Sequence, residues 1–292
     1  MSLSATADAH FSIGKTHRVC EDYARAGALP DGRAFAIVSD GCSSSPDTDF
    51  GSRLLTVAAQ ERMIQAGDRF DPFTVIWQAL GASRNMRLPP TCLDATLHAL
   101  FQKGNGDVRA VLIGDGALAA RRRDGQMETW RLRFLPGDTG LVAPGYLSYI
   151  LEMSRFQQYI NQGYNKWMVE HTLDGILQGT ETGEASFKEA EDGTFRPVDL
   201  WHVMDFPAET YDYVMVLSDG VESFQEMKSP GVFAPVPFQD VMLHLTAMKS
   251  LTGPFVAKRL KMFLERTCPK LGWHHNDDLS AAGIALSEEE PS

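Results

Sequence analysis

The feature that most constrains the fold of this chain is a short apolar run that ends in Asp-Gly and occurs three times. The three dipeptides are Asp40-Gly41, Asp115-Gly116 and Asp219-Gly220. The preceding runs are rich in β-branched and other aliphatic residues, which predicts buried strands that end at turns. At such a position Asp projects a carboxylate from a strand end, and Gly lets backbone or a ligand approach closely. We therefore expect several carboxylates to be presented at strand ends.

A single Asp-Gly pair is weak evidence for a site, because it is also the favoured centre of a type I′ hairpin turn. Asp124-Gly125 lies between two strand-like runs, and we interpret it as a turn of that kind. Two acidic pairs, Glu21-Asp22 and Asp277-Asp278, also flank expected strands. If they converge with the three strand ends, unit charges about 4 Å apart repel by about 4 kcal/mol at an effective dielectric near 20. Such a cluster needs cations or must bind protons, and carboxylates favour Mg²⁺ or Mn²⁺ over zinc.

The remaining pattern groups strands together and separates the groups by pairs of helices. Further strands are expected at residues 91–101, 117–123, 127–134 and 279–286, and helices at residues 47–65, 72–86, 237–249 and 254–268. Strands do not alternate singly with helices, as they would in a doubly wound parallel sheet, so we predict one α+β domain over residues 1–292. Residues 140–206 break the pattern and are interpreted as an inserted flap. Within it we expect an aromatic-rich helix at 146–162 and an exposed loop at 179–193.

The composition argues against several classes of partner. The chain of 292 residues has 27 basic and 38 acidic residues and a net charge of −11, which repels nucleic acids and anionic membrane surfaces. No segment approaches the roughly 18 consecutive apolar residues of a membrane helix, and the N-terminus lacks the order of a signal peptide. We expect a cytoplasmic protein that binds neither nucleic acid nor membrane. Its four cysteines lie far apart without a Cys-x-x-Cys pair and are expected to be free thiols.

The acidic residues fall in ordered motifs that span nearly the whole chain. These are Cys20-Glu21-Asp22, Val38-Ser39-Asp40-Gly41, Asp94-Ala95-Thr96-Leu97, Ile113-Gly114-Asp115-Gly116, Leu217-Ser218-Asp219-Gly220 and Asn276-Asp277-Asp278-Leu279-Ser280. In this order the chain resembles the metal-dependent protein Ser/Thr phosphatases of type 2C, and more closely their stand-alone bacterial relatives. The resemblance implies a four-layer αββα sandwich. Two packed antiparallel sheets would be flanked by helix pairs, with metals at one end.

The resemblance further implies two divalent ions, Mn²⁺ or Mg²⁺, held by five residues. Asp40 would bridge the two ions. Glu21 and the backbone carbonyl of Gly41 would complete the protein ligands of one ion. Asp219 and Asp277 would complete those of the other.

The same resemblance assigns two more acidic residues and a reaction. Asp22 would act beside Asp40 in catalysis, as the acceptor of a hydrogen bond from metal-bound water. Asp115, with Asp219, would match a weaker third metal position. The implied reaction is hydrolysis of phosphoserine or phosphothreonine by a water that bridges the two metals. The partner would be a phosphoprotein, the product of a Ser/Thr kinase.

The chain departs from the family where the substrate phosphate is held. Members usually carry an Arg four residues before the metal-binding Glu, but His17 occupies that position here, and Arg18 could serve with a one-residue shift. Cys42 replaces the His of eukaryotic members, and Ala117 stands where many members have Arg. Two alternatives therefore stay open. One is a catalytically weak pseudophosphatase that acts as a binding or regulatory module, and the other is a hydrolase of small phosphate esters.

Overall fold

Two large antiparallel sheets form the centre of the molecule. The computed structural model describes residues 3–189, 195–229 and 231–288. The larger sheet has seven strands in the order β1-β17-β13-β6-β7-β8-β9. They are β1 (Leu3–Ser12), β17 (Leu279–Glu288), β13 (Tyr211–Leu217), β6 (Gly116–Arg122), β7 (Met127–Phe134), β8 (Lys166–Leu173) and β9 (Ile176–Glu184). The second sheet has the order β12-β5-β4-β3-β2. It contains β12 (Trp201–Phe206), β5 (Val108–Ile113), β4 (Leu97–Gln102), β3 (Ala34–Ser39) and β2 (Tyr23–Ala28).

The side chains of β3 show why the two sheets pack face to face. Successive residues of a strand point to opposite faces. Ala36 and Val38 are fully buried against the other sheet, in a cluster that includes Ile284 of β17. Phe35 and Ile37 are buried on the opposite face. Because both faces of this strand are covered, its sequence is apolar throughout and does not alternate with polar residues.

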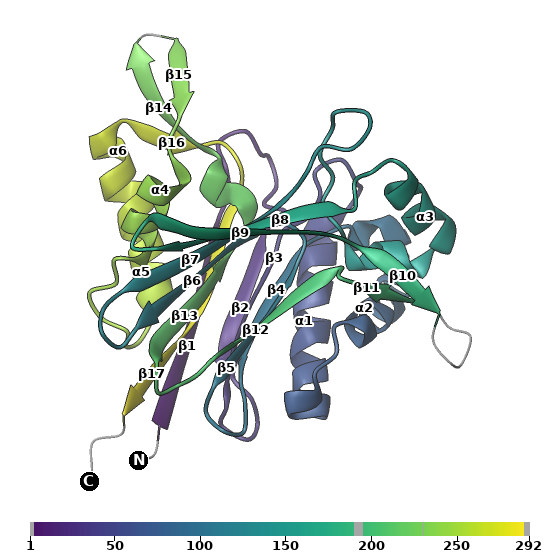
Figure 1. Ribbon diagram of the computed structural model, residues 1–292, viewed down its shortest axis with the longest axis horizontal. Coiled ribbons are helices and arrows are strands. Elements are labelled where there is room, and N and C mark those ends of the chain that lie inside the picture. The colour runs from purple at the N-terminus through teal and green to yellow at the C-terminus, as the bar shows by residue number, and fades with distance from the viewer. Residues whose placement is uncertain (1–2, 190–194, 230, 289–292) are drawn as a thin grey trace.

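Helices cover the two outer faces and complete four layers (Figure 1). α1 (Thr48–Ala66) and α2 (Phe73–Asn85) pack on the five-stranded sheet through a cluster that includes Leu55 and Ile76. α4 (Phe238–Thr246), α5 (Phe255–Met262) and α6 (Cys268–Leu271) cover the seven-stranded sheet through residues such as Val241 and Leu260. The predicted α+β sandwich with helices on both sides is confirmed.

Smaller elements lie at the edges of this sandwich. They are η3 (Leu147–Leu151), α3 (Met153–Asn161), β10 (Ser186–Glu189), β11 (Phe195–Val198), β14 (Phe224–Ser229), β15 (Val232–Pro235) and β16 (Trp273–His275), together with the short helical turns η1 (Gly67–Arg69), η2 (Pro90–Leu93), η4 (Asp219–Glu222) and η5 (Phe263–Thr267). The β14–β15 hairpin stands out from the sandwich, and α3 with the β10–β11 hairpin lies beside the α1–α2 layer (Figure 1).

The segment between β7 and β12 differs from its predicted structure. The aromatic helix expected at 146–162 is broken by Glu152, which has extended backbone angles (φ −139°, ψ 102°) between η3 and α3. The loop expected at 179–193 is instead strand: it contains the end of β9 and all of β10, while residues 190–194 lie outside the described residues. β9 is exposed along nearly its whole length, so its polar sequence lacks the alternation that indicates a strand. Backbone pairing with β8 holds it in place.

Two further differences concern local patterns. The strand expected at 91–101 begins only at Leu97, because residues Pro90–Leu93 form a helical turn. β1 and β2 were not expected, since their core-facing positions are alanines such as Ala5, Ala7 and Ala9, which carry a weak apolar signal. The four cysteines are free, as predicted. None of the helices in the described part of the chain has the length and apolar character needed to cross a membrane.

Candidate metal centre

Three strand ends bring the repeated Asp-Gly pairs to one edge of the sandwich. Asp40 follows β3, Asp115 lies between β5 and β6, and Asp219 follows β13. All three line one pocket of about 310 Å³. Gly41, His17 and Asp277 line it too, so six of the predicted site residues share this pocket. Segments up to 260 residues apart in the chain therefore converge here.

The carboxyl groups lie close enough to share protons. Burial and the neighbouring charges of Asp22 and Asp219 raise the pKa of Asp40 well above its usual range, and Asp40 shares hydrogen bonds with both. Burial raises the pKa of Asp22 to about 7 and that of Asp219 to about 6. Burial and the charge of Asp219 likewise raise the pKa of Asp115. Such shifts are expected where several carboxylates are desolvated together without a cation.

Asp22 lies behind the pocket and is completely buried. Its Oδ2 accepts a hydrogen bond of 2.7 Å from the Ser218 hydroxyl, at the end of β13. Its Oδ1 is buried without a hydrogen-bond partner among the described residues, and the same holds for Oδ1 of Asp219. Buried oxygens without partners are costly unless a proton or a cation satisfies them.

Glu21 and Gly41 are held together at the side of the pocket. The N–H of Gly41 donates to the backbone carbonyl of Glu21 at 3.2 Å, and the Thr48 hydroxyl donates to the Glu21 side chain at 3.2 Å. Thr48 is the first residue of α1, so this helix positions the segment after β3. The Glu21 side chain does not itself line the 310 Å³ pocket.

Asp115 is positioned by a histidine that no sequence motif indicated. His98 of β4 is fully buried, and burial lowers its pKa to about 4, so the ring is neutral. Its Nε2–H donates to the backbone carbonyl of Asp115 at 2.8 Å. A Cβ on Gly116 would lie 2.4 Å from that nitrogen, which explains why glycine follows Asp115. The repeated Asp-Gly pair thus has a packing reason at this site as well as a chemical one.

Asp278 is a second residue to which the sequence alone assigned no role, although it belongs to one of the ordered motifs. It is 1% exposed, and its two oxygens accept hydrogen bonds from the backbone N–H of Gly14 (2.7 Å) and of Glu21 (2.6 Å). A Cβ on Gly220 would lie 1.8 Å from the backbone oxygen of Asp278, so the Asp219-Gly220 turn packs directly on it. One buried carboxylate therefore ties the segment that carries Glu21 to the segment that carries Asp277.

The two residues predicted to hold phosphate lie in different surroundings. His17 lines the pocket, with Nε2 3.3 Å from Asp277 and Nδ1 3.1 Å from Asp278. Burial lowers the pKa of His17, but the hydrogen bond and charge of Asp278 and the charge of Asp277 outweigh it, so the pKa is raised. Arg18 is exposed and lies outside the lining of the pocket.

The segment after β7 forms one wall of the pocket through Val142, Pro144 and Tyr146. A buried ion pair holds this wall: Asp94, 1% exposed, accepts hydrogen bonds from Arg155 of α3 (2.8 Å) and from the Ser148 hydroxyl (2.6 Å). The aromatic residues of this segment pack on one another as a core cluster, and Tyr146 reaches the pocket as well. Sequence patterns do not reveal this wall, because Asp94 and Arg155 are 61 residues apart.

The arrangement and the chemistry of the side chains differ in how well they suit a metal ion. No group of three or more His, Cys, Asp or Glu side chains in the described part of the chain is arranged so that it could hold a metal ion as it stands. The carboxyls instead share protons, and two buried oxygens lack partners. Oxygen-only donors with raised pKa values suit hard cations such as Mn²⁺ or Mg²⁺, which would replace the shared protons. The donor chemistry of the carboxyl groups therefore fits divalent ions, although their present arrangement does not form a metal site.

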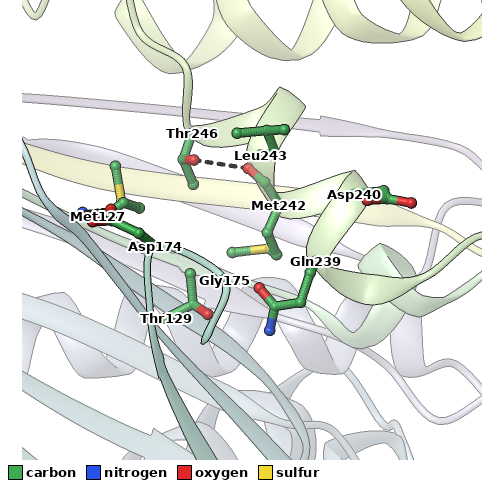
Figure 2. Close-up of a pocket in the computed structure, with 9 residues that line it drawn as sticks. All are labelled: Met127, Thr129, Asp174, Gly175, Gln239, Asp240, Met242, Leu243 and Thr246. Atoms are coloured by element: carbon green, nitrogen blue, oxygen red, sulfur yellow. Dashed lines mark hydrogen bonds between the residues drawn. The ribbon is translucent and has the colours of Figure 1, made fainter. Parts of the chain in front are cut away.

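Another pocket, of about 380 Å³, lies between β7 and α4 at the far end of β7 (Figure 2). It is lined by apolar residues such as Met127 and Met242 and by the turn at Asp174 and Gly175. None of the acidic residues of the 310 Å³ pocket contributes to it. Its lining lacks the convergent carboxylates that distinguish the candidate metal centre.

Comparison with known proteins shows which proteins this chain is similar to in sequence and in fold. Residues 12–131 match the family model described as protein phosphatase 2C. The structure is similar to the serine/threonine phosphatase Stp1 from Staphylococcus aureus, with a TM-score of 0.55 and 11% identity over 99% of this chain and 98% of that chain. A bacterial serine phosphatase gives a TM-score of 0.53 and 11% identity over 98% and 99% of the two chains. No curated protein matches the chain at a significant level.

A third similar structure is the type 2C phosphatase domain, with a fragment of the regulatory domain, of SpoIIE from Bacillus subtilis. It has a TM-score of 0.50 and 11% identity, over 99% of this chain and 65% of that chain. At these identities the structures show a shared fold, while the family model covers the part of the chain that contains Glu21, Asp40 and Asp115. The predicted resemblance to bacterial type 2C phosphatases is thereby confirmed.

Proposed function

We propose that this protein hydrolyses phosphoserine and phosphothreonine in phosphoproteins, the products of Ser/Thr kinases, and that it needs Mn²⁺ or Mg²⁺. The observation that carries the proposal is the convergence of Asp40, Asp115, Asp219 and Asp277 on one pocket, where burial raises the pKa of the first three. Phosphate esters hydrolyse very slowly in water, so a catalyst must supply positive charge and exact positioning. A set of carboxylates alone repels a phosphate, which makes cations a requirement of this site.

The residues would divide the work as follows. Asp40, which lies beside Asp22 and Asp219, would bridge the two ions. Glu21 and the Gly41 carbonyl would complete one ion's protein ligands. Asp219 and Asp277 would complete those of the other.

Asp115 and Asp22 would have different tasks. Asp115, with Asp219, would hold a weaker third ion. When bound, the ions would lower the pKa of a bridging water and offset the charge of the phosphoryl group. Asp22, which accepts a hydrogen bond from the Ser218 hydroxyl, would act beside Asp40 as the acceptor of a hydrogen bond from metal-bound water.

The test compares activity with and without metal. Protein stripped with EDTA should not hydrolyse a phosphoserine peptide, and Mn²⁺ should restore turnover. Asp40→Asn and Asp219→Asn should each lower kcat/KM by about a thousandfold or more, because each removes a ligand charge. Asp205→Asn is the matched control, since Asp205 pairs with Arg109 on β5 at an exposed position. Full activity in excess EDTA would contradict the proposal.

The same assay separates the two other functions. A hydrolase of small phosphate esters would turn over phosphorylated metabolites faster than phosphopeptides. A pseudophosphatase would bind Mn²⁺ in a calorimeter without turnover of either kind of substrate. His17, which occupies the position of the family's phosphate-holding Arg, is paired with Asp277 and Asp278 instead. This observation is the reason for testing the two alternatives.

A further inference from the structure

Arg133 lies beside the candidate metal centre at the end of β7. The register of β6 with β7 pairs Gly116 with Leu132 and Ala117 with Arg131. Asp115 precedes Gly116 and Arg133 follows Leu132, so the two residues lie at the same end of this pair of strands. Arg133 and Asp115 accordingly line the same groove of about 360 Å³, together with Asp219.

The guanidinium of Arg133 is held on one side and open on the other. Its Nη2 donates to Glu170 at 2.9 Å, and its Nε is buried without a hydrogen-bond partner within the described part of the chain. Arg131, two residues earlier on the same face, is fully engaged: it forms a forked pair with Glu222 and lies 5.0 Å from the ring centroid of Phe238. The side chain of Arg133 is 36% exposed, against 21% for Arg131. Because the side chain of Arg133 is partly exposed and lines the groove, its guanidinium is accessible from the groove.

The charges of the groove define what Arg133 can bind. Among the described residues that line it, Arg133 is the one with a positive charge, and Asp115, Asp219 and Glu222 are negative. In the neighbouring 310 Å³ pocket the basic side chain is His17, which faces two aspartates. Arginine offers planar, paired N–H donors that match phosphate oxygens, and such charge-assisted hydrogen bonds are strong.

We propose that Arg133 contacts the phosphoryl group of the substrate and anchors it over the carboxylate cluster. This inference rests on the proposed phosphatase function, and it places the anion-binding task on β7 in place of the segment that carries His17 and Arg18. Glu170 accepts a hydrogen bond from the guanidinium of Arg133, and Glu222 is paired with Arg131. Once cations offset the charge of the carboxylates, Arg133 supplies a donor on the open side of the groove.

The experiment measures phosphate binding directly on the full-length, Mn²⁺-loaded protein. Arg133→Ala should weaken the binding of inorganic phosphate by about tenfold or more and raise KM for p-nitrophenyl phosphate by a similar factor. Arg133→Lys should recover part of the loss, because it keeps the charge but not the paired donors. Mn²⁺ affinity and the midpoint of thermal unfolding should stay close to wild type in both variants.

Two controls separate phosphate contact from a structural role. Glu170→Gln removes the same ion pair from the other side and should change phosphate affinity less than threefold. Arg109→Ala removes an exposed arginine pair on β5 and should have no effect on phosphate binding. If Glu170→Gln reproduced the loss seen in Arg133→Ala, the effect would be due to the ion pair, and the inference would be wrong.

The outcomes also distinguish this inference from the proposed function. Wild-type turnover together with normal phosphate affinity in Arg133→Ala would overturn the inference and leave the phosphatase proposal intact. Phosphate binding that depends on Arg133, without turnover of any ester, would support the inference and contradict the phosphatase proposal. Absence of phosphate binding by the Mn²⁺-loaded wild type would overturn the inference directly.

Discussion

At the scale of single residues, Asp278 shows how one side chain organises groups that belong to both ends of the chain. Its carboxylate is buried, and it accepts hydrogen bonds from the backbone of Gly14 and Glu21, 264 and 257 residues away. His17 also lies within 3.1 Å of it. A buried charge is tolerated only when such partners satisfy it. Asp278 therefore positions the proposed ligands Glu21 and Asp277 without itself facing the 310 Å³ pocket.

We predict that Asp278→Asn destabilises the protein and weakens Mn²⁺ binding. The amide has one acceptor oxygen where the carboxylate has two, so one backbone N–H loses its partner at a cost of about 1–3 kcal/mol. Urea unfolding would measure the loss, and calorimetry the change in Mn²⁺ affinity. Asp205→Asn, at an exposed ion pair, should cost less than about 1 kcal/mol. Equal stability of the two variants would show that Asp278 has no such role.

At the scale of elements, the wall of the pocket depends on contacts between the segment after β7 and the turn before β4. Arg155 of α3 and Ser148 of η3 both donate to Asp94, and the Ser45 hydroxyl donates to the same carboxylate at 2.7 Å. Arg155 also lies 4.7 Å from the ring centroid of Tyr149. These contacts join the loop after Asp40 to the segment that carries Tyr146, so this wall of the pocket is held by both segments.

We predict that Arg155→Ala loosens this wall. The variant leaves the Asp94 carboxylate buried with two hydroxyl donors and no positive charge, which should cost about 1–3 kcal/mol in the free energy of unfolding; the partial exposure of Arg155 keeps the figure below that of a fully buried pair. Hydrogen exchange at residues 142–156 should become faster, while β3 and β4 stay protected. Gln157→Ala, on the exposed side of the same helix, should change neither quantity. Unchanged hydrogen exchange in Arg155→Ala would show that Arg155 does not hold this wall.

At the scale of the whole molecule, the acidic cluster couples folding to protons and metal. Raised carboxyl pKa values mean that the folded protein binds protons more tightly than the unfolded chain, whose aspartates titrate near pH 3.9. The resulting stability is present below that pH and is lost as pH rises through about 6 and 7, the pKa values of Asp219 and Asp22. Metal ions would replace the protons and remove this loss.

We predict that metal-free protein is more stable at pH 5.5 than at pH 8, by on the order of 2 kcal/mol. Mn²⁺ should stabilise the protein more at pH 8 than at pH 5.5, because protons compete with the metal for the same oxygens. Urea unfolding at the two pH values, with and without Mn²⁺, tests both statements. Asp22→Asn should flatten the pH dependence of the metal-free protein. A metal-free protein that is more stable at pH 8 would contradict the account.

The parts of the fold that the sequence alone determined are those with a strong local pattern. Three fully apolar runs predict buried strands, and the Asp-Gly pairs predict where those strands end. The helix pairs follow from apolar periodicity and from starting signals such as Pro72 before α2. The order of the motifs was enough to indicate the family, and the pocket contains five of the six predicted metal-site residues, all except Glu21.

The tertiary structure alone decided which distant groups meet. The alanine-rich β1 and β2 and the polar β9 have weak local signals, and pairing with β17, β3 and β8 holds them in the sheets. Asp278, Asp94 and Arg133 gain their importance from partners that are distant in sequence or that depend on strand register. A local pattern reports whether a side chain faces core or solvent, but it carries no information about which segment lies opposite. The acidic residues of the site can therefore be predicted from the sequence. The residue proposed to hold the phosphate can be identified only from the pairing of β6 with β7.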